Sequence, residues 1–336
     1  MRVVQYGLGP IGLACVQTLL DKAPAGRLSL VGAIDIDPAK VGRDLADLLG
    51  RDTKTGVVVS NDAGAALAAL KPDVVLHTTS SFLDRVETQL AGCLDAGAHV
   101  VSSTEELSFP YDRHPEVAAR LNAKAKAAQR VVVGTGVNPG YAMDALARMA
   151  TGVCTEVSHV AVDRVVDAGA RRGPLQRKVG AGITAAAFAE KKATGTFGHI
   201  GLRESLLMVA DGLGWALDAL EETLDPVLSD RAITTPHADV AAGQVAGIRH
   251  AIRGSIQGEE VLALTLQMYV GADGSHDTVR VTGTPPITLT VPGGIFGDTA
   301  TIAALVNTAG LVASGDLQPG LRTMADLPVL RAFATR

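Results

Sequence analysis

A glycine pattern close to the N-terminus constrains the fold of this chain more than any other feature. The run "RVVQYGLGPIG" starts at Arg2 as a short β-branched stretch, and Gly7, Gly9 and Gly12 follow it directly before a helical pattern. In a G-x-G-x-x-G loop the first glycine permits a tight turn. The second lets the backbone approach a phosphate, and the third lets the helix pack closely on the strand. A strand, this loop and a helix in succession predict a βαβ unit that binds a dinucleotide.

Strand-like and helix-like segments then alternate through the first 136 residues. The strand-like runs are 2–7, 28–35, 56–60, 72–79, 98–103 and 130–136, and the helical patterns are 12–23, 38–50, 63–71, 82–97 and 114–129. Short apolar runs separated by helical patterns are typical of parallel strands with helices on both faces. We therefore predict an α/β fold with a Rossmann-type, doubly wound parallel sheet whose ligand crevice lies at the carboxyl ends of the strands.

The pattern changes after residue 150. The runs 156–166, 260–271, 277–284 and 286–291 are more strongly alternating, as in an antiparallel sheet with one covered face. We expect helices at 183–193 and 201–221, and an ordered loop at 167–182. The periodic stretch 298–314 is expected to return to the first domain. The predicted domains are a dinucleotide-binding domain, 1–145 joined by 295–336, and a second α+β domain, 146–294, for substrate binding and dimerisation. We expect the substrate to bind between them.

Composition excludes several classes of protein. The 336 residues are 47% hydrophobic and 19% charged, which is typical of a globular chain. The net charge is −5 and the basic residues are not clustered, so nucleic acid and anionic membrane are not expected partners. No apolar run is long enough to span a membrane. Cys15, Cys93 and Cys154 lie far apart without metal-ligand spacing, which favours reduced thiols, no metal site and a cytoplasmic location.

An acidic residue at the end of the second strand-like run extends the cofactor prediction. Asp35 lies 23 residues after Gly12, where an acid accepts hydrogen bonds from the adenosine ribose. An acid there favours NAD over NADP, while Lys40 and Arg43 lie near enough in sequence to soften the preference. Asp37 is a weaker candidate, since it precedes Pro38 and is also suited to capping a helix. The residues expected at the pyrophosphate are Gly7, Leu8, Gly9, Pro10, Ile11 and Gly12.

Two further strand ends carry polar residues. Thr78, Thr79 and Ser80 end the fourth run, where they either line the crevice beside the nicotinamide or cap the next helix. In "GTGVNPGYAMDAL", Gly136 belongs to a glycine loop after the sixth run. Asn138 is predicted to cap the helix that follows and also to hold the carboxamide of the cofactor.

Six segments together resemble the 2,4-diaminopentanoate dehydrogenases and the native amine dehydrogenases, which are relatives of dihydrodipicolinate reductase. They are "DIDPAKVGRDL", "STEELSFP", "GTGVNPGYAMD", "PLQRKVGAG", "GGIFGDTATIAALVN" and "PGLRTMADLP". The resemblance covers nearly the whole chain. It implies a homodimer and the NAD(P)-dependent deamination of an amine, reversible as reductive amination. The His-His pair of dihydrodipicolinate reductase is missing from the matching stretch 165–182, so that enzyme's own reaction is not expected.

The resemblance also places the family's catalytic carboxylate in the segment "EEL". Glu105 and Glu106 follow the fifth strand-like run, at the crevice. A carboxylate there can take a proton from ammonia, stabilise an iminium and return a proton to departing water. We favour Glu105 and expect only one of the two acids to face inward, because neighbours on an extended chain point to opposite sides. The other acid is then solvated or caps a helix, and the alternative is that both are first-turn acids of a helix.

The substrate pocket is less clearly defined by the sequence. We expect Tyr141, Gln176, Phe197, His199, Met208 and Ile295 to contribute to it, with mainly apolar walls that suit a simple ketone or aldehyde. An amino-acid substrate would need a cationic clamp, for which the sequence offers Arg171, Arg172, Lys178 and Arg203. A diaminopentanoate dehydrogenase would also need an acidic partner such as Asp144, Asp163 or Asp167. A non-catalytic sensor of NAD(P)H is the third alternative.

Overall fold

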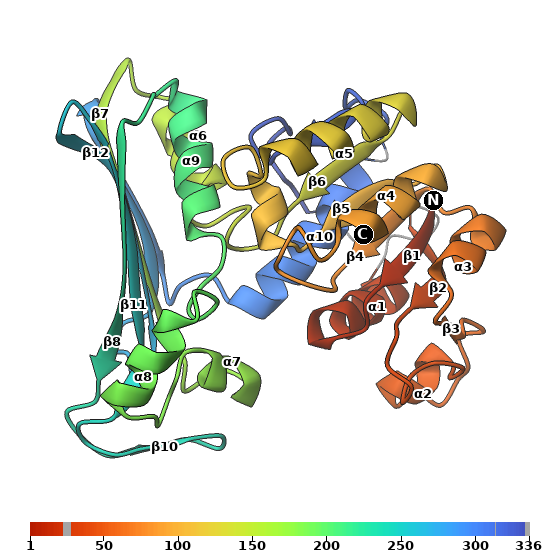
Figure 1. Ribbon diagram of the computed structural model, residues 1–336, viewed down its shortest axis with the longest axis horizontal. Helices are drawn as coiled ribbons and strands as arrows, with labels where there is room; N and C mark the ends of the chain where they lie inside the picture. The colour runs from red at the N-terminus through yellow and green to blue at the C-terminus, as the bar shows by residue number, and fades with distance from the viewer. Residues whose placement is uncertain (23–27, 313, 333–336) are drawn as a thin grey trace. The chain divides into compact units, whose positions relative to one another are not determined.

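The computed structural model describes residues 1–22, 28–312 and 314–332. The chain forms two compact units, which we call unit 1, Met1–Tyr141 with Gly297–Arg336, and unit 2, Ala142–Phe296 (Figure 1). Ala23 and Ala313, which belong to two of the predicted helical patterns, lie outside the described residues.

Unit 1 contains a parallel sheet of seven strands in the order β15-β6-β5-β4-β1-β2-β3. The strands are β1 (Arg2–Tyr6), β2 (Ser29–Ile34), β3 (Val59–Ser60), β4 (Val74–His77), β5 (His99–Ser102), β6 (Val131–Gly134) and β15 (Gly320–Arg322). All four residues of β4 are buried, as expected for a strand covered on both faces. The predicted Rossmann-type α/β class is confirmed. The strand β15, which the sequence analysis did not identify, pairs with β6.

Helices pack on both faces of this sheet. They are α1 (Pro10–Lys22), α2 (Leu45–Leu49), α3 (Ala63–Leu70), α4 (Glu87–Asp95), the 3₁₀ helix η1 (Glu105–Ser108), α5 (Pro115–Ala127) and α10 (Gly297–Val312). One apolar core joins α3, α4 and α5 to the strands through residues such as Leu67, Leu90 and Leu121. On the other face α1 packs beside α10 and against β2. The crossovers thus bring the loops after β1, β4, β5 and β6 to one edge.

Unit 2 contains a mixed, mostly antiparallel sheet in the order β14-β13-β7-β12-β11-β8, in which only β7 and β12 run parallel. The strands are β7 (Glu156–Asp167), β8 (Ala219–Leu228), β11 (Val245–Ile256), β12 (Glu259–Tyr269), β13 (His276–Thr284) and β14 (Ile287–Pro292), and β9 (Ile233–Thr234) pairs with β10 (Asp239–Val240). The helices are α6 (Ala145–Thr151), α7 (Gly173–Lys178), α8 (Ala185–Ala193) and α9 (Leu202–Leu213). Figure 1 shows α6, α8 and α9 on the same side of this sheet.

Three predicted helices are shorter than expected, and of 82–97 only Glu87–Asp95 is helical. The pattern 201–221 ends as a helix at Leu213, where Gly214 at φ 69° caps α9, and Ala219 already starts β8. Pairing of β8 with β11 overrides the helical preference of the sequence there. In 38–50 only Leu45–Leu49 is helical, because Gly42 has φ 79° and Asp44 caps a new helix by accepting from the N–H of Ala46.

Two loop predictions also need correction. Asn138 does not cap a helix: Gly140 has φ 124°, which interrupts helical geometry, and α6 begins only at Ala145 with Asp144 as its N-cap. The predicted loop 167–182 contains the short helix α7. Across the described residues, the structure has no helix that is both long and apolar enough to cross a bilayer.

Candidate cofactor and catalytic site

The backbone of the glycine loop is closely packed at some positions and open at another. Gly7 has φ +93°, and a β-carbon there would lie 2.6 Å from the carbonyl oxygen of Thr78. A β-carbon on Gly12 would lie 1.9 Å from the carbonyl oxygen of Gly7, whereas one on Gly9 would meet nothing within 4 Å. The loop is therefore tightly packed at its two ends and open at Gly9, directly before the N-terminus of α1 at Pro10. A helix N-terminus favours a negatively charged group at that open position.

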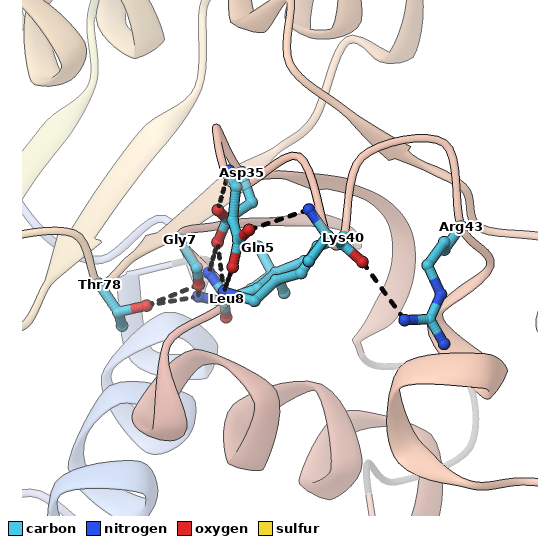
Figure 2. Close-up of polar contacts among 9 residues, drawn as sticks. Gln5, Gly7, Leu8, Asp35, Lys40, Arg43 and Thr78 are labelled. Carbon is cyan, nitrogen blue, oxygen red and sulfur yellow. Dashed lines mark hydrogen bonds and ion pairs between the residues drawn. The ribbon is translucent and has the colours of Figure 1, made fainter.

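The side chains of Gln5 and Thr78 hydrogen-bond to the backbone of this loop and to each other. The Nε2 of Gln5 donates to the carbonyl of Gly7 at 2.9 Å and to the hydroxyl of Thr78 at 2.8 Å. The Thr78 hydroxyl in turn donates to the same carbonyl at 2.9 Å (Figure 2). Leu8 is fully buried beneath the loop. Sequence reasoning missed Gln5, whose only signal was an amide inside an otherwise apolar strand.

Asp35 follows β2 and points toward the glycine loop, as Figure 2 shows. Its Oδ2 accepts from the N–H of Leu8 at 2.6 Å, and its Oδ1 accepts from the N–H of Asp37 at 2.8 Å. These bonds fix the carboxylate beside the loop, at the position where a dinucleotide-binding fold holds the adenosine ribose. Lys40 lies next to it, with Nζ 3.6 Å from Asp35 Oδ2 and 3.1 Å from Asp37 Oδ2.

The segments that follow β4 and β5 are hydrogen-bonded to each other. The N–H of Ser103 donates to the carbonyl of His77 at 2.9 Å, and the hydroxyl of Thr104 donates to the carbonyl of Ser80 at 2.8 Å. The N–H of Glu106 donates to the carbonyl of Ser81 at 3.3 Å. The acidic turn is therefore attached to the neighbouring strand end.

His77 is the fully buried centre of this region. Its Nδ1 lies 2.9 Å from the hydroxyl of Ser102, and its Nε2 lies 2.8 Å from Gln89 Oε1 and 3.0 Å from the hydroxyl of Thr79. The Ser102 hydroxyl itself donates to Thr104 Oγ1 at 2.9 Å, so the ring belongs to a network that continues to the segment after β5. Burial lowers the pKa of His77 to about 4, against a weaker opposing effect of Gln89. The imidazole is therefore neutral near pH 7.

The hydroxyls of Thr79 and Ser80 have local partners. Thr79 donates to Gln89 Oε1 at 2.8 Å, and Ser80 Oγ accepts from the N–H of Phe82 at 3.2 Å. These bonds shape the turn between β4 and α4. A role beside the nicotinamide stays a prediction for Thr78, Thr79 and Ser80.

The two glutamates, Glu105 and Glu106, have different environments in the structure. Both lie on the turn η1 rather than on an extended chain, so the strand argument about their facing is wrong. Glu106 is only 8% exposed, and its Oε2 accepts from the N–H of Leu83 at 2.7 Å and lies 3.0 Å from His114 Nε2. Glu106 is therefore neither solvated nor a helix cap. It is a buried group that links η1 to Leu83, in the segment between β4 and α4. Glu105 is half-buried.

The loop after β6 packs against α10. A β-carbon on Gly136 would lie 3.1 Å from the carbonyl oxygen of Pro139, and the N–H of Val137 donates to Thr301 Oγ1 at 3.3 Å. Asn138 and Tyr141 are both half-buried in this region. The C-terminal helix thus supports a loop at the same edge as the glycine loop.

The predicted pocket residues of unit 2 differ in accessibility. Met208 is fully buried in α9, and Phe197 packs edge-on against Phe188 at 5.2 Å between ring centroids. The Gln176 amide is engaged within its own loop, because Nε2 donates to the carbonyls of Gly169 and Arg171 and Oε1 accepts from Thr235. Roles of these residues in substrate binding remain predictions.

A row of polar side chains crosses the helix-covered face of the second sheet. Register places Asp277, Arg164, Leu266 and His250 side by side on four adjacent strands. Arg164 forms a buried ion pair with Asp277 and donates to the carbonyl of Ile295 at 2.7 Å. The Nε2 of His250 lies 2.9 Å from Glu222 Oε1, and its buried Nδ1 meets no hydrogen-bond partner among the described residues.

The half-buried His199 lies near this polar row. Burial holds the pKa of His199 well below its usual value, and the neighbouring Lys178, His250 and Arg164 lower it further. Basic groups from three elements thus act on His199, although Arg164 and His250 themselves have the carboxylate partners Asp277 and Glu222.

Other charged residues named by the sequence have structural contacts. Arg171 is buried, with its guanidinium 4.1 Å from the ring centroid of Phe296. Asp144 accepts from the hydroxyl of Ser205 at 2.7 Å. Asp163 pairs with Arg280, and Asp167 accepts from the N–H groups of Gly169 and Gly271.

Comparison with known proteins supports the fold and the order of these segments. Residues 141–336, more than half of the chain, match the family model described as "2,4-diaminopentanoate dehydrogenase C-terminal domain". A 2,4-diaminopentanoate dehydrogenase of Acetoanaerobium sticklandii is 32% identical over 99% of this chain and 95% of its own length. An amine dehydrogenase of Streptomyces virginiae is 25% identical over 99% of this chain and 98% of its own length.

Solved structures agree with this assignment. The amine dehydrogenase of Mycobacterium smegmatis superposes with a TM-score of 0.86 at 27% identity, covering 99% of this chain and 97% of that one. Dihydrodipicolinate reductase of Paenisporosarcina shares the fold alone, with a TM-score of 0.51 at 13% identity over 97% of this chain and 98% of that one. The chain belongs to the 2,4-diaminopentanoate dehydrogenase and amine dehydrogenase family of NAD(P)-dependent oxidoreductases, which act on CH–NH₂ donors.

Proposed function

We propose that this protein catalyses the reversible reductive amination of a ketone or aldehyde with ammonia, with Glu105 as the general base. The observation that carries the proposal is the position of η1, which follows β5 at the carboxyl edge of the parallel sheet. The carboxylate of Glu106 accepts from the N–H of Leu83 and lies beside His114, which gives it a structural part in this turn. Glu105 is the half-buried acid of the same turn, at the carboxyl edge of a parallel sheet where such folds bind ligands.

The chain's own residues have distinct parts in this scheme. The glycine loop, residues 7–12, would hold the pyrophosphate, and the bound nicotinamide supplies or accepts the hydride. Glu105 takes a proton as ammonia adds to the carbonyl, stabilises the cationic iminium by its charge, and returns a proton as water leaves. The contacts of Glu106 keep η1 in place while this happens.

We also propose that Asp35 gives a preference for NAD. Its carboxylate is fixed beside the glycine loop by Leu8 and Asp37. A negative charge there accepts hydrogen bonds from a ribose hydroxyl and repels a 2′-phosphate.

The test of the activity is a screen of carbonyl compounds with excess ammonium at alkaline pH, followed by the loss of NADH absorbance. The proposed reaction gives ammonium-dependent NADH oxidation, and the reverse reaction reduces NAD with the product amine. Tight NADH binding without any turnover would instead identify a sensor of the cofactor.

A second candidate function is the deamination of an amino acid or diamino acid. The position of Lys178 near His199 favours it, because an ammonium attracts a substrate carboxylate. The family model and the Acetoanaerobium relative are both described as 2,4-diaminopentanoate dehydrogenases. Comparing 2-pentanone with 4-oxopentanoate isolates the carboxylate: preference for the oxo acid that disappears in Lys178→Met supports the second candidate.

Two further predictions concern the oligomeric state of the protein and its location in the cell. We propose a homodimer formed through the sheet face opposite α8 and α9, which carries the half-buried Arg249, Thr265 and Gln267 and has no helix packed on it in the described part of unit 2. Light scattering coupled to size-exclusion chromatography tests this, with Gln267→Arg as the interface variant. A cytoplasmic location also stays a prediction, consistent with the buried, free thiols of Cys15 and Cys93.

A further inference from the structure

The segment after β2 carries three charged side chains, although a dinucleotide-binding fold needs only one acid there. Asp35 and Asp37 lie two residues apart, and Lys40 bridges them, with Nζ 3.6 Å from Asp35 Oδ2 and 3.1 Å from Asp37 Oδ2 (Figure 2). Only 23% of the Lys40 side chain and 11% of the Asp35 side chain are exposed. The pair is therefore screened by solvent less than an ordinary surface ion pair.

The backbone holds both acids in fixed positions. Asp35 accepts from the N–H of Leu8 and of Asp37, and Asp37 accepts from the N–H of Ala39 at 2.9 Å. That last bond, followed by Lys40, lowers the pKa of Asp37. Lys40 is on a flexible stem, so it is the mobile member of a group with two fixed negative charges.

We propose that Lys40 is a specificity-determining residue, which as counter-ion of Asp35 allows the site to bind a ribose 2′-phosphate as well as a 2′-hydroxyl. The inference rests on the proposed cofactor site and deepens it. With Lys40 present, a 2′-phosphate meets a group whose two carboxylates and one ammonium sum to a single negative charge. Without it, the phosphate meets two uncompensated carboxylates. Lys40 therefore decides how strongly Asp35 discriminates against NADPH.

Arg43 provides a matched control. It lies three residues further on and carries the same charge, but its guanidinium donates to the carbonyls of Ala39 and Asp47, each at 3.3 Å. Figure 2 shows this side chain pointing away from Asp35. If a positive charge near the loop were sufficient to allow a 2′-phosphate, removing Arg43 and removing Lys40 would have the same effect on NADPH binding.

The experiment is a calorimetric titration of the full chain with NADH and with NADPH, without substrate. In Lys40→Met the ratio of the NADPH dissociation constant to the NADH dissociation constant should rise roughly tenfold. In Arg43→Met the ratio should stay within about twofold of wild type. In Asp37→Asn, which keeps an acceptor for the Ala39 N–H but removes a charge, the ratio should fall. In the wild-type protein, added salt should weaken the binding of NADPH more than the binding of NADH.

An unchanged ratio in Lys40→Met overturns the inference, as does an equal change in Arg43→Met, which would make Arg43 the determinant. Because the readout is binding, it is independent of amination: normal nucleotide binding with no turnover would refute the proposed activity and leave the role of Lys40 intact. Binding of neither nucleotide to the wild-type chain would refute both. Circular dichroism of each variant checks that a changed ratio of dissociation constants does not result from unfolding.

Discussion

The glycine loop of unit 1 and the polar row of unit 2 both place polar side chains in buried positions, but they satisfy them differently. Around the glycine loop, Gln5 and Asp35 bond mainly to the backbone of Gly7 and Leu8. In the polar row, Arg164 pairs with Asp277, a side chain 113 residues away in sequence. Backbone contacts preserve a loop geometry that any ligand of the right shape can use. Pairs of side chains create a particular charge pattern, which depends on the register of the strands that carry them.

The largest expected effect is on catalysis in unit 1. Glu105→Ala should lower the rate of amination by about 10²–10⁴-fold, since a positioned general base is lost. NADH affinity should remain nearly intact, because the proposed pyrophosphate and ribose contacts are made by other residues. Steady-state rates with saturating ammonium and a calorimetric NADH titration measure the two effects.

Glu106→Ala is the matched variant on the same turn. It leaves the buried N–H of Leu83 without its acceptor, which costs roughly 1–3 kcal/mol of folding stability, and its effect on the rate should be smaller than that of Glu105→Ala. A dead Glu106→Ala enzyme beside an active Glu105→Ala enzyme would show that the base is Glu106. Near wild-type rates in both would refute the carboxylate mechanism.

The next largest effect is on the stability of unit 2. Asp277→Ala leaves the buried guanidinium of Arg164 uncompensated and removes the acceptor of the Ile295 N–H, whose bond to Asp277 is 2.6 Å long. Breaking a buried ion pair costs about 3–5 kcal/mol. Urea unfolding should therefore show a much lower midpoint.

Glu260→Ala is the control for that prediction, because it removes a partly exposed partner of Arg253 in the same sheet and should cost less than about 1 kcal/mol. Equal losses of unfolding free energy in Asp277→Ala and Glu260→Ala would show that the buried ion pair stabilises the protein no more than the exposed one. The double variant Arg164→Met/Asp277→Leu should recover part of the stability, since it leaves no unpaired charge.

These two regions also explain what sequence reasoning could and could not predict. The glycine loop was predictable because its pattern is local, three spaced glycines between a strand and a helix, although the group that excludes a side chain at Gly7 is the carbonyl of Thr78, 71 residues away. Asp35 was predictable for the same reason, since it ends the adjacent strand. The partners of Glu106 were not predictable: Leu83 lies 23 residues earlier in the chain, and its N–H carries no sequence signal.

The second sheet was predictable as a class but not in detail. Alternation in 156–166 and 277–284 indicated strands with one covered face, yet alternation gives no register. Register alone places Arg164 opposite Asp277 and in the same row as His250. The first three residues of β8, 219–221, were predicted as helix because the pairing of this strand with β11 is a tertiary contact that local preference does not report.

The smallest effect is the dependence of stability on pH in unit 1, and it concerns His77. The pKa of this buried imidazole is lowered to about 4, whereas the unfolded chain has the ordinary value of about 6.5. Below pH 6.5 the unfolded state therefore binds a proton that the folded state does not, and acidification favours unfolding. The contribution of His77 is complete above pH 6.5 and is lost as the pH falls toward 4.

At pH 5 the loss from this single group is about 2 kcal/mol relative to pH 7. Urea unfolding at the two pH values measures it, and His77→Gln serves as the comparison, since an amide keeps a donor and an acceptor but does not titrate. The variant should be less stable at pH 7 and should depend less on pH by the same 2 kcal/mol. The buried position of His99, whose pKa is also lowered to about 4, contributes equally to both proteins and cancels in the difference. Parallel pH profiles for wild type and variant would mean that His77 titrates normally in the folded protein. The network from Gln89 through His77 to Ser102 would then have to be open to water, and would differ little from an exposed surface site.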